Sequence, residues 1–371
     1  NTSTNLHTLS TPLSNVGINT TVTSDIDGDV RPLAPSGTVD IGADEFNIPA
    51  ENIGVFAVLN PALPLTPGLQ NVVVQIKNYG TATITSANVR YKVGVNGSIY
   101  TFPWTGTITT GSTANVTFTG ANQYNFTGTK DSIFAWTDGP NGLPDGYAAN
   151  DSAMSIICAP LNGNYTIDSS MATGGSNFRS FNDAIGSLNS CGITGPVRFT
   201  VAAGTYNGSL DITSIFGSSA VNTVTFDGVN SATRIITAIT SAAAPAVLRF
   251  NACNFVTFRN VTVRTTDASN GWAAHFFNGT NNRVTNSILE IGGAGATSAN
   301  SNLAPVVMNG SLTSMGTSST IGNNHRVDSS TLNAGYYSVY TANSSNTNVL
   351  YFLNNTMNNA YYYGASLNNG H

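Results

Sequence analysis

Three aspartates near the start of the chain alternate in sequence: Asp25, Asp27 and Asp29. Gly28 lies among them and permits a sharp turn, and alternate carboxylates are typical of calcium ligands. An EF-hand loop would need Glu at its twelfth position, which is Ser36 here, so that motif is not met. The alternatives are a calcium cage of another kind, completed by further acidic residues, or an Asx-rich hairpin without metal. The further candidates are Asp40, Asp44 and Glu45. No other cofactor is predicted.

Hydrolysis or elimination of polysaccharides is a second chemistry to consider. Glycoside hydrolysis needs two carboxylates about 5–10 Å apart, and a lyase needs a base, often with calcium held by acidic residues. After residue 160 the acidic residues stand singly: Asp168, Asp183, Asp211, Asp227, Asp267, Glu290 and Asp328. No Asp-Asp or Gly-His-Gly run occurs there, and no lysine follows Lys130. No catalytic residue is therefore predicted.

Arginines and tyrosines of the C-terminal part offer a third chemistry, the binding of sugars. Four arginines near predicted turns would grip an acidic sugar or form solvated strand edges: Arg259, Arg264, Arg283 and Arg326. The final section is rich in tyrosine: Tyr336, Tyr337, Tyr340, Tyr351, Tyr361, Tyr362 and Tyr363. Outward tyrosines stack on sugar rings or form protein interfaces, whereas inward ones fill the core. Both interpretations stay open from sequence.

Composition narrows the classes of function. Only 8% of the 371 residues are charged, against about 25% in ordinary soluble domains. The net charge is −5, and residues 1–151 hold 11 acidic against 5 basic residues. Without a basic patch, nucleic acid and anionic membranes are disfavoured as partners. No run approaches the ~18 apolar residues of a membrane-spanning helix. The first residue is Asn1, so we expect a piece of a longer protein.

A short pattern recurs four times near the C-terminus: an apolar residue, a small polar residue two positions on, and an apolar residue five positions on. Its first members are Phe258, Val284, Val327 and Phe352, at steps of 26, 43 and 25 residues. Recurrence at about 20–50 residues is typical of solenoids, in which each coil buries its apolar face on the next. The polar members are Asn260, Asn286, Ser329 and Asn354. We predict that the three asparagines form an inward ladder of stacked amides, and that more coils follow residue 371.

Three segments follow from the pattern along the chain, and the fold class is all-β. Residues 1–46 are predicted to be terminal coils of a preceding β-helix, 47–160 an antiparallel β-sandwich, and 161–371 a helix-capped parallel β-helix. The phrase DIDGDVRPLAPSGTVDIGADEF resembles the segment that closes right-handed parallel β-helices in bacterial surface proteins.

The sandwich is predicted from β-branched and aromatic runs separated by turn residues: 72–76, 89–93, 114–118 and 132–136. Asn96-Gly97 is a strong hairpin signal. The stretch QNVVVQIKNYGTATITSANVRYKV resembles adhesion-type immunoglobulin-like (CARDB-like) modules of bacteria. About 100 residues is the size of such a module.

One helix is expected, because Phe178, Phe181, Ile185 and Leu188 share a helical face. Ser176 is its predicted N-cap and Gly192 its stop. The following GPVRFTVAAGTYNGSL resembles the opening of a pectin-lyase-like β-helix, in which a helix caps the first coil. A cap is physically required, since the first coil would otherwise expose its interior and a free strand edge.

Cysteine usage leaves one alternative open. Cys158, Cys191 and Cys253 fit no metal-binding spacing. Cys253 lies among alternating apolar residues and is expected to be a buried, inert thiol. Cys158 and Cys191 are expected either to pair in an oxidising compartment or to stay reduced.

The modules together resemble large type IX-secreted surface proteins of Bacteroidetes. This resemblance implies a non-enzymatic, extracellular structural or adhesive segment that assembles with copies of itself into a fibre or appendage and contacts surface glycans of another cell. Asp131-Ser132-Ile133 and Asp151-Ser152-Ala153 resemble O-glycosylation sites of such proteins, with Ser132 and Ser152 as acceptors. The alternatives are a polysaccharide lyase or hydrolase, and a glycan-binding module without turnover.

Overall fold

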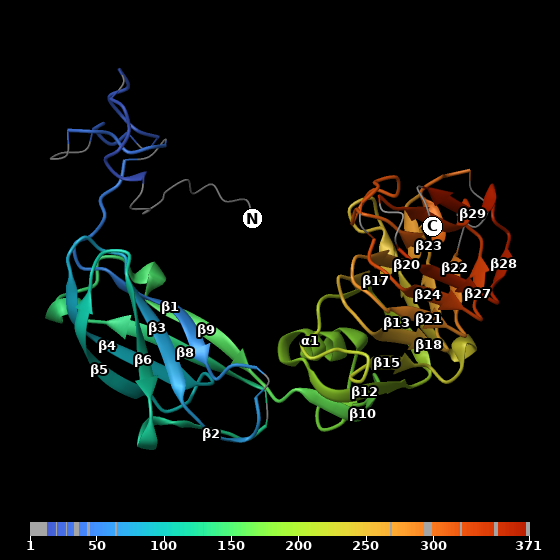
Figure 1. Cartoon of the computed structure of the whole chain (residues 1–371), viewed down its shortest axis with the longest axis horizontal. Coiled ribbons are helices and arrows are strands. Elements are labelled where there is room, and N and C mark those ends of the chain that lie inside the picture. Colours follow the sequence, from blue (N-terminus) through green and yellow to red (C-terminus); the bar gives the residue numbers. More distant parts are fainter. Residues whose placement is uncertain are drawn as a thin grey trace. The chain divides into compact units, whose positions relative to one another are not determined.

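The computed structural model describes residues 13–368, except 20, 27, 33–36, 43–44, 64, 129, 268, 293–298, 320 and 345–347. The chain is mostly β and divides into two compact units, residues 1–159 and 160–371 (Figure 1). The N-terminal unit contains antiparallel sheets, and the C-terminal unit contains long parallel sheets. Each unit is described by itself below.

The N-terminal unit contains two main antiparallel sheets. The first has the order β1 (Ile53–Asn60), β3 (Val72–Asn78), β6 (Thr113–Phe118), and the second β5 (Tyr100–Ile108), β4 (Ile84–Val93), β8 (Asp131–Asp138), β9 (Ser152–Ile157). A small pair joins β2 (Gly68–Gln70) to β7 (Tyr124–Phe126). Three short 3₁₀ turns lie in the connections: Gly120–Asn122, Pro140–Gly142 and Ala148–Asn150. The four predicted strand runs lie within β3, β4, β6 and β8 and are confirmed.

The two main sheets share one hydrophobic core. Strand β3 buries every second residue, with Val72, Val74 and Ile76 all inaccessible to solvent. They belong to the same cluster as Val89 on β4 and Ile133 on β8. The alternation is what an antiparallel sheet with one covered face requires. The predicted hairpin at Asn96-Gly97 joins β4 to β5 through residues 94–99.

The described residues between 13 and 46 contain no strand of a parallel sheet. The prediction that residues 1–46 are terminal coils of a preceding β-helix also covers residues outside the described ones and stays a prediction. A single antiparallel bridge joins Ser24 to Val30. The buried carboxylates of Asp40 and Glu45 organise this segment by accepting backbone and arginine hydrogen bonds. Asp40 accepts from the backbone N–H groups of Asn15 and Phe46, and Glu45 accepts from Arg31. Polar side-chain contacts thus replace a regular sheet ladder here.

The C-terminal unit is a parallel β-helix built from three sheets. Sheet 1 has the order β11 (Asn177–Phe178), β10 (Leu161–Ile167), β12 (Ile193–Val201), β15 (Val224–Asp227), β18 (Val256–Arg259), β21 (Arg283–Thr285), β24 (His325–Asp328), β27 (Leu350–Leu353). Sheet 2 has β13 (Gly204–Asn207), β16 (Arg234–Ala238), β19 (Thr262–Thr265), β22 (Ile288–Ile291), β25 (Thr331–Asn333), β28 (Thr356–Asn358). Sheet 3 has β14 (Leu210–Ile212), β17 (Ala246–Asn251), β20 (Gly271–Phe277), β23 (Leu303–Met308), β26 (Tyr337–Ala342), β29 (Tyr363–Asn368). A 3₁₀ turn at Ser231–Thr233 precedes β16.

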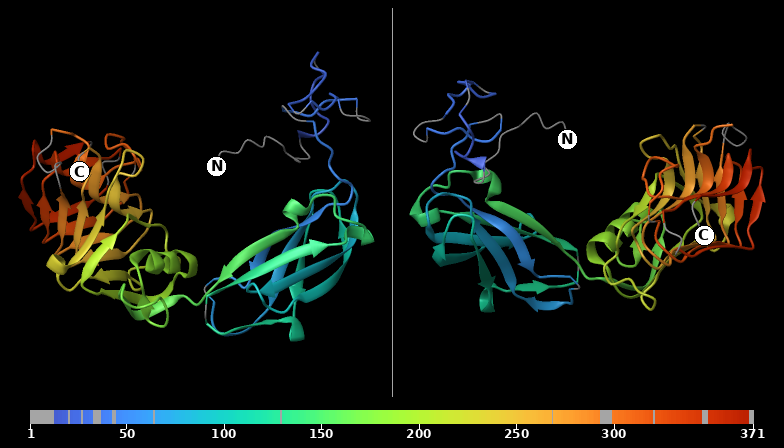
Figure 2. Two further views of the ribbon diagram at one scale, coloured as in Figure 1. Left: turned by 180° about the vertical axis from the view of Figure 1, so that it is seen from behind. Right: turned by 45° about the horizontal axis from the view of Figure 1, so that its top comes forward.

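Each coil contributes one strand to each sheet, and successive coils lie on one another (Figure 2). The unequal repeat length has a simple origin. In the 43-residue step from Val284 to Val327 the extra residues lie between β22 and β23 and between β23 and β24, so the strands keep their register. Loops tolerate insertion at low cost because chain-closure entropy rises slowly with length.

The interior of the solenoid is a stack of side chains from equivalent positions. Phe199, Phe226 and Phe258 stack nearly parallel, with ring centroids 4.8 and 4.4 Å apart. The column continues in register through Val284, Val327 and Phe352. Phe258, Val284 and Val327 have no exposed surface. Such columns arise because parallel strands in register place the same face of each coil at one interstrand spacing.

The recurring asparagines do not form the predicted inward amide ladder. Asn286 and Asn354 are exposed, and the Asn260 amide donates to Asp227 at 2.8 Å instead. Asn260, Asn286, Ser329 and Asn354 all have φ between 48° and 56°, at the corner between sheets 1 and 2. Asparagine adopts this left-handed conformation more readily than most residues. Backbone geometry, not amide stacking, therefore explains the repeat.

The buried ladder lies one position further along the chain. The Val261 N–H donates to Ser287 Oγ at 3.3 Å, the Ser287 N–H to Ser330 Oγ at 3.1 Å, and the Ser330 N–H to Asn355 Oδ1 at 3.0 Å. Ser287 and Ser330 are 2% and 3% exposed. Each side chain satisfies a backbone donor of the preceding coil, which would otherwise be buried without a partner.

Helix α1 (Phe181–Cys191) precedes β12 and lies beside the first coil. Its N-cap is Ser180, whose Oγ accepts from the Asp183 N–H at 3.1 Å, and Gly192 ends it with φ of 67°. The prediction of Ser176 as the cap was wrong, because Phe178 belongs to strand β11 and the helical face begins at Phe181. Ile185 and Leu188 are buried as predicted. The helix covers apolar side chains at the start of the solenoid.

Candidate functional site

The outer face of sheet 1 carries the main cluster of charged side chains in the solenoid. Successive side chains of a strand point to opposite faces of the sheet, so the residues on either side of an inward position form two outward columns. The first column runs Arg198, Thr225, Thr257, Arg283, Arg326, Tyr351. The second runs Thr200, Asp227, Arg259, Thr285, Asp328, Leu353. Charged and aromatic residues far apart in sequence therefore lie side by side.

Two aspartates on this face each hold two arginines. Asp227 Oδ2 accepts from Arg198 at 2.7 Å and from Arg259 at 2.6 Å. Asp328 accepts two bonds from Arg283, both at 2.7 Å, and one from Arg326 at 2.8 Å. The aspartate side chains are 3% and 4% exposed, whereas the arginines are exposed by about two-fifths or more. Each cluster has two positive charges and one negative charge.

These carboxylates are held in the ionised state. Burial by itself would raise the pKa of Asp328, but the hydrogen bonds from Arg283, Arg326 and Thr285 lower it to about 2. The pKa of Asp227 is also about 2, because bonds from Asn260, Val229 and its two arginines outweigh burial. Neither group supplies a proton at neutral pH, which a general acid in glycoside hydrolysis must do.

The two aspartates are also too far apart to act as a pair. Asp227 lies on β15 and Asp328 on β24, three strands along the same column. Three interstrand spacings amount to about 14 Å, beyond the separation of about 5–10 Å that the two carboxylates of a glycosidase need. This pair of aspartates therefore does not meet the geometry of the two carboxylates of a glycosidase.

Both histidines in the described part of the solenoid are buried in the scaffold. His275 lies between Arg249 and Asn309, with its ring nitrogens 3.1 and 2.9 Å from them. Burial and the nearby Arg249 charge lower the pKa of His275 to about 3, and burial lowers that of His325 to about 4. His325 approaches the carbonyl of Asn278 at 3.2 Å. Neither imidazole is exposed to solvent, so neither is placed to act as a base on a bound substrate.

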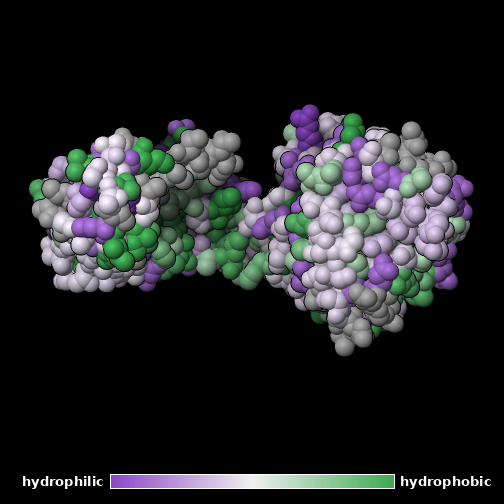
Figure 3. All heavy atoms as spheres, turned by 90° about the horizontal axis from the view of Figure 1, so that it is seen from above, coloured by the Kyte–Doolittle hydropathy of each residue, from purple (hydrophilic) through white to green (hydrophobic). Residues whose placement is uncertain are grey.

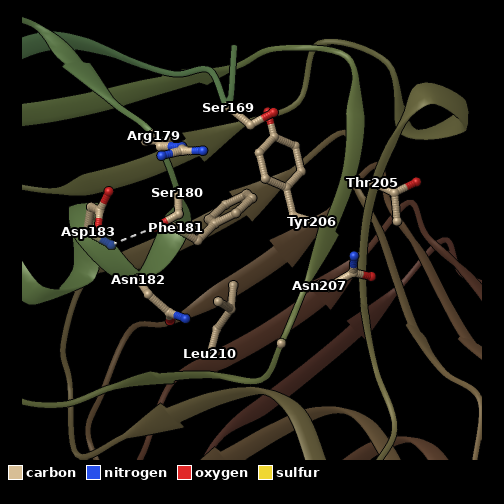
Figure 4. Close-up of a pocket in the computed structure, with 11 residues that line it drawn as sticks. Ser169, Arg179, Ser180, Phe181, Asn182, Asp183, Thr205, Tyr206, Asn207 and Leu210 are labelled. Carbon is tan, nitrogen blue, oxygen red and sulfur yellow. Dashed lines mark hydrogen bonds between the residues drawn. The ribbon is translucent and has the colours of Figure 1, made fainter. Parts of the chain in front are cut away.

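A hollow of about 420 Å³ lies where α1 meets the first coil (Figure 4). Its wall is core structure, because the rings of Phe181 and Tyr206 meet edge to face at 5.1 Å and the Tyr206 hydroxyl lies 3.0 Å from two backbone carbonyls. Figure 4 shows Arg179, Asn182 and Asn207 around it. The carboxylate that lines it, Asp183, accepts from Thr173 at 2.6 Å. The hollow is polar but lacks a paired acid and base.

The last described coil leaves apolar side chains uncovered. Met357 and Leu367, which continue interior columns, are 40% and 52% exposed, whereas Leu332 in the preceding coil has no exposed surface. Strands β27, β28 and β29 are each the final strand of their sheet. Tyr361, Tyr362 and Tyr363 are also about half exposed, and Tyr363 lies on the same face of β29 as Leu367. In the view of Figure 3, the solenoid surface is mostly pale, with purple and green patches.

The predicted calcium ligands are used otherwise where the structure describes them. Asp25 accepts from the backbone N–H groups of Asp29 and Glu45, at 2.8 and 3.1 Å. Among the described residues, no three His, Cys, Asp or Glu side chains are grouped to hold a metal ion. Asp27 and Asp44 lie outside the described residues, so calcium in this segment stays a prediction.

The remaining predicted residues are accounted for as follows. Ser132 lies partly buried in β8, and Ser152 is exposed at the start of β9. Cys158 and Cys191 are both disulfide-bonded, and Cys253 is a buried free thiol. Burial raises the pKa of Cys253 far above its usual value, in keeping with an inert thiol. No helix among the described residues is long and apolar enough to cross a membrane.

Comparison with known proteins gives little. No family model matches the chain, and no curated protein matches it. A solved structure of a pectin methylesterase mutant in complex with a hexasaccharide is similar, with a TM-score of 0.31 and 13% identity. The match covers 54% of this chain and 80% of that one. The description as a parallel β-helix therefore depends on the strand registers themselves.

Proposed function

We propose that this chain is a non-enzymatic structural and adhesive segment of a large extracellular surface protein, and that it assembles with copies of itself. The observation that carries the proposal is the unbroken stack of coils, whose interior column stays in register from Phe199 to Phe352. In a solenoid each coil packs on its neighbours, so the stack forms an extended scaffold.

A parallel β-helix suits a mechanical role. Consecutive coils share backbone hydrogen bonds along all three sheets, from β12 to β27, from β13 to β28 and from β14 to β29. Bending such a rod would stretch many of these bonds together. Each added coil extends the interior columns without changing the rest of the fold.

The charged groups support a role without catalysis. Asp227 and Asp328 are ionised, held by arginines and separated by about 14 Å. The alternative, a polysaccharide lyase or hydrolase, predicts new reducing ends or unsaturated products from pectin or alginate. We expect none from this chain, and reproducible product formation that grows with protein concentration would refute the non-enzymatic proposal.

The extracellular location is part of the proposal. The disulfide state of Cys158 and Cys191 supports it, because disulfides persist in oxidising compartments. The 8% charged fraction is in keeping with a stacked surface scaffold. Type IX secretion and the immunoglobulin-like identity of the sandwich are proposed from the sequence resemblance alone.

Self-assembly is testable with the chain itself. We expect it to form dimers or longer assemblies as its concentration rises, measured by light scattering and negative-stain electron microscopy.

Assemblies that grow with protein concentration support self-association. A folded chain that stays monomeric at every concentration contradicts it. Circular dichroism checks that the chain is folded.

A further inference from the structure

A second hollow lies on the outer face of sheet 1, near the end of the two outward columns. Its volume is about 390 Å³. It is lined by Asn281, Asn282, Arg283, Asn324, Arg326 and Tyr351. We call it the arginine hollow. Arg283, Arg326 and Tyr351 occupy one register position on three neighbouring strands, so their side chains leave the sheet side by side.

The two guanidinium groups of the arginine hollow are held in place by Asp328 and still have free hydrogen-bond donors. Asp328 accepts from Nε and Nη2 of Arg283 and from Nε of Arg326. Nη1 of Arg283 and both Nη atoms of Arg326 donate no hydrogen bond to another described residue. The bonds to Asp328 hold both planar groups in place, which lowers the entropy lost when they bind an anion. One positive charge remains uncompensated.

The rest of the lining is neutral and suited to a ring with hydroxyl groups. Tyr351 is 38% exposed and presents an aromatic ring next to Arg326. Asn324 donates its amide to the amide oxygen of Asn281, which lies one coil earlier. Both asparagines have left-handed backbone, with φ of 59° and 58°. The hollow thus combines a cationic pair, an aromatic ring and amides within a few strands.

We propose that the arginine hollow binds a carboxylate-bearing sugar of an acidic glycan. The carboxylate bonds to the free guanidinium N–H groups of Arg283 and Arg326, the sugar ring stacks on Tyr351, and its hydroxyls bond to Asn281 and Asn324. A single surplus positive charge matches one carboxylate per sugar. It matches poorly a densely charged polyanion, which the net charge of −5 also repels.

The same face offers a second attachment point for a linear glycan. Arg198 and Arg259 flank Asp227 as Arg283 and Arg326 flank Asp328, and both clusters belong to the same two columns. Their separation of about 14 Å runs along the stack of strands. A chain of acidic sugars lying along this axis meets both clusters, which strengthens binding through effective concentration.

The inference deepens the adhesive role proposed above by naming its ligand class, and rests on that role only for its biological meaning. Its test is titration calorimetry of the full chain with polygalacturonate oligomers, and with neutral dextran oligomers of equal length. We expect saturable binding of the uronate oligomers that weakens as salt concentration rises. Arg326→Gln is expected to weaken it about tenfold, and Tyr351→Ala about fivefold.

The matched control is Arg264→Gln on sheet 2. Arg264 is an ion-paired arginine with the same 40% side-chain exposure as Arg326, but it is bound to Glu290 on another face. It is expected to change affinity by less than about twofold. Light scattering of the same samples reports assembly independently, so a failure of assembly and a failure of glycan binding are read separately.

Three results would overturn the inference. They are equal binding of neutral dextran, parent-level affinity in folded Arg326→Gln and Tyr351→Ala, and no binding of uronate oligomers at all. Dextran sulfate serves as a further arm. Binding of dextran sulfate without any binding of polygalacturonate would also reject a carboxylate ligand.

Discussion

Each of the two units contains an aspartate with a strongly shifted pKa, and the two shifts have opposite directions. In the solenoid, Asp328 is surrounded by Arg283 and Arg326, and its pKa falls to about 2. In the antiparallel unit, burial together with the charges of Asp145 and Asp138 raises the pKa of Asp151 to about 6. One carboxylate is stabilised as an anion and the other is destabilised.

The difference follows from topology. A solenoid places the same strand position of every coil at one spacing, so an aspartate meets arginines of its own and neighbouring coils. In the antiparallel unit, Asp138 ends β8 and Asp151 immediately precedes β9, and Asp145 lies in the connection between them. Like charges therefore gather at one end of the sheet. Stacked coils thus place opposite charges beside one another, whereas the connection between β8 and β9 brings three aspartates together.

The two units also differ in how their cores are built. The antiparallel unit shares one closed core cluster between its sheets. The solenoid has a column of stacked rings, Phe199, Phe226 and Phe258, that continues in register through the later coils. In the solenoid each coil therefore packs mainly on its neighbours, whereas the antiparallel unit packs its two main sheets around one cluster.

The largest expected effect comes from breaking the ring column of the solenoid. Phe258→Ala removes a fully buried ring that stacks on Phe226 and is expected to cost the solenoid about 3–5 kcal/mol of unfolding free energy. The antiparallel unit should keep its own thermal transition, observed by scanning calorimetry. Phe216→Ala, at a residue 55% exposed, is the control. An equal shift of both transitions would show that the units do not differ as described.

A smaller effect is expected from removing the shared carboxylate. Because the folded pKa of Asp328 is lowered to about 2, its stabilisation is present above pH 4 and is lost as pH falls towards 2. Asp328→Asn should cost about 1–2 kcal/mol at pH 7, allowing for the partly exposed arginines. In thermal melts, the difference in stability between the parent and Asp328→Asn should decrease as the pH falls from 4 to 3.

Asp211→Asn is the control for this measurement. Its carboxylate is 49% exposed and lies 3.8 Å from Arg249, so its loss is expected to cost less than about 1 kcal/mol. A pH-independent gap between parent and Asp328→Asn would contradict the role assigned to the ionised carboxylate.

The opposite sign is expected in the antiparallel unit. Since the folded pKa of Asp151 is raised to about 6, the unit loses stability as pH rises from about 4 through 6. Asp151→Asn should therefore stabilise this unit at pH 7 and change little at pH 4. The gain is expected to be below about 1 kcal/mol, because solvent screens a partly exposed group. A variant less stable than the parent at pH 7 would refute the assignment.

The smallest effect concerns the corner where serine replaces asparagine. Ser329 has φ of 50° at the position that Asn260, Asn286 and Asn354 hold in other coils. Ser329→Asn is expected to stabilise the solenoid by about 0.5–1 kcal/mol, because asparagine tolerates left-handed backbone better. Ser344→Asn, at an exposed residue outside these corners, is the control. No difference between the two variants would mean that backbone strain does not select asparagine.

Sequence reasoning found the interior columns but mistook the reason for the asparagines. Alternating burial and stacked apolar positions are properties of the local pattern, so Phe258, Val284 and Val327 were identifiable. The amides were expected inside, because a repeating polar residue suggested side-chain pairing. The positive φ values of these corners can be read only from the backbone. The seryl ladder at Ser287 and Ser330 was missed, since serines are common throughout the chain.

The sequence by itself determined the strands, the solenoid repeat and the low charge, because these depend on side-chain type and on a period that neighbouring residues set. Tertiary structure decided which charges meet. Arg198 and Arg259 reach Asp227 across 29 and 32 residues, and Arg283 reaches Asp328 across 45. Those separations include loops of unequal length, which sequence spacing cannot align, whereas the backbone ladder of stacked coils brings the side chains into register.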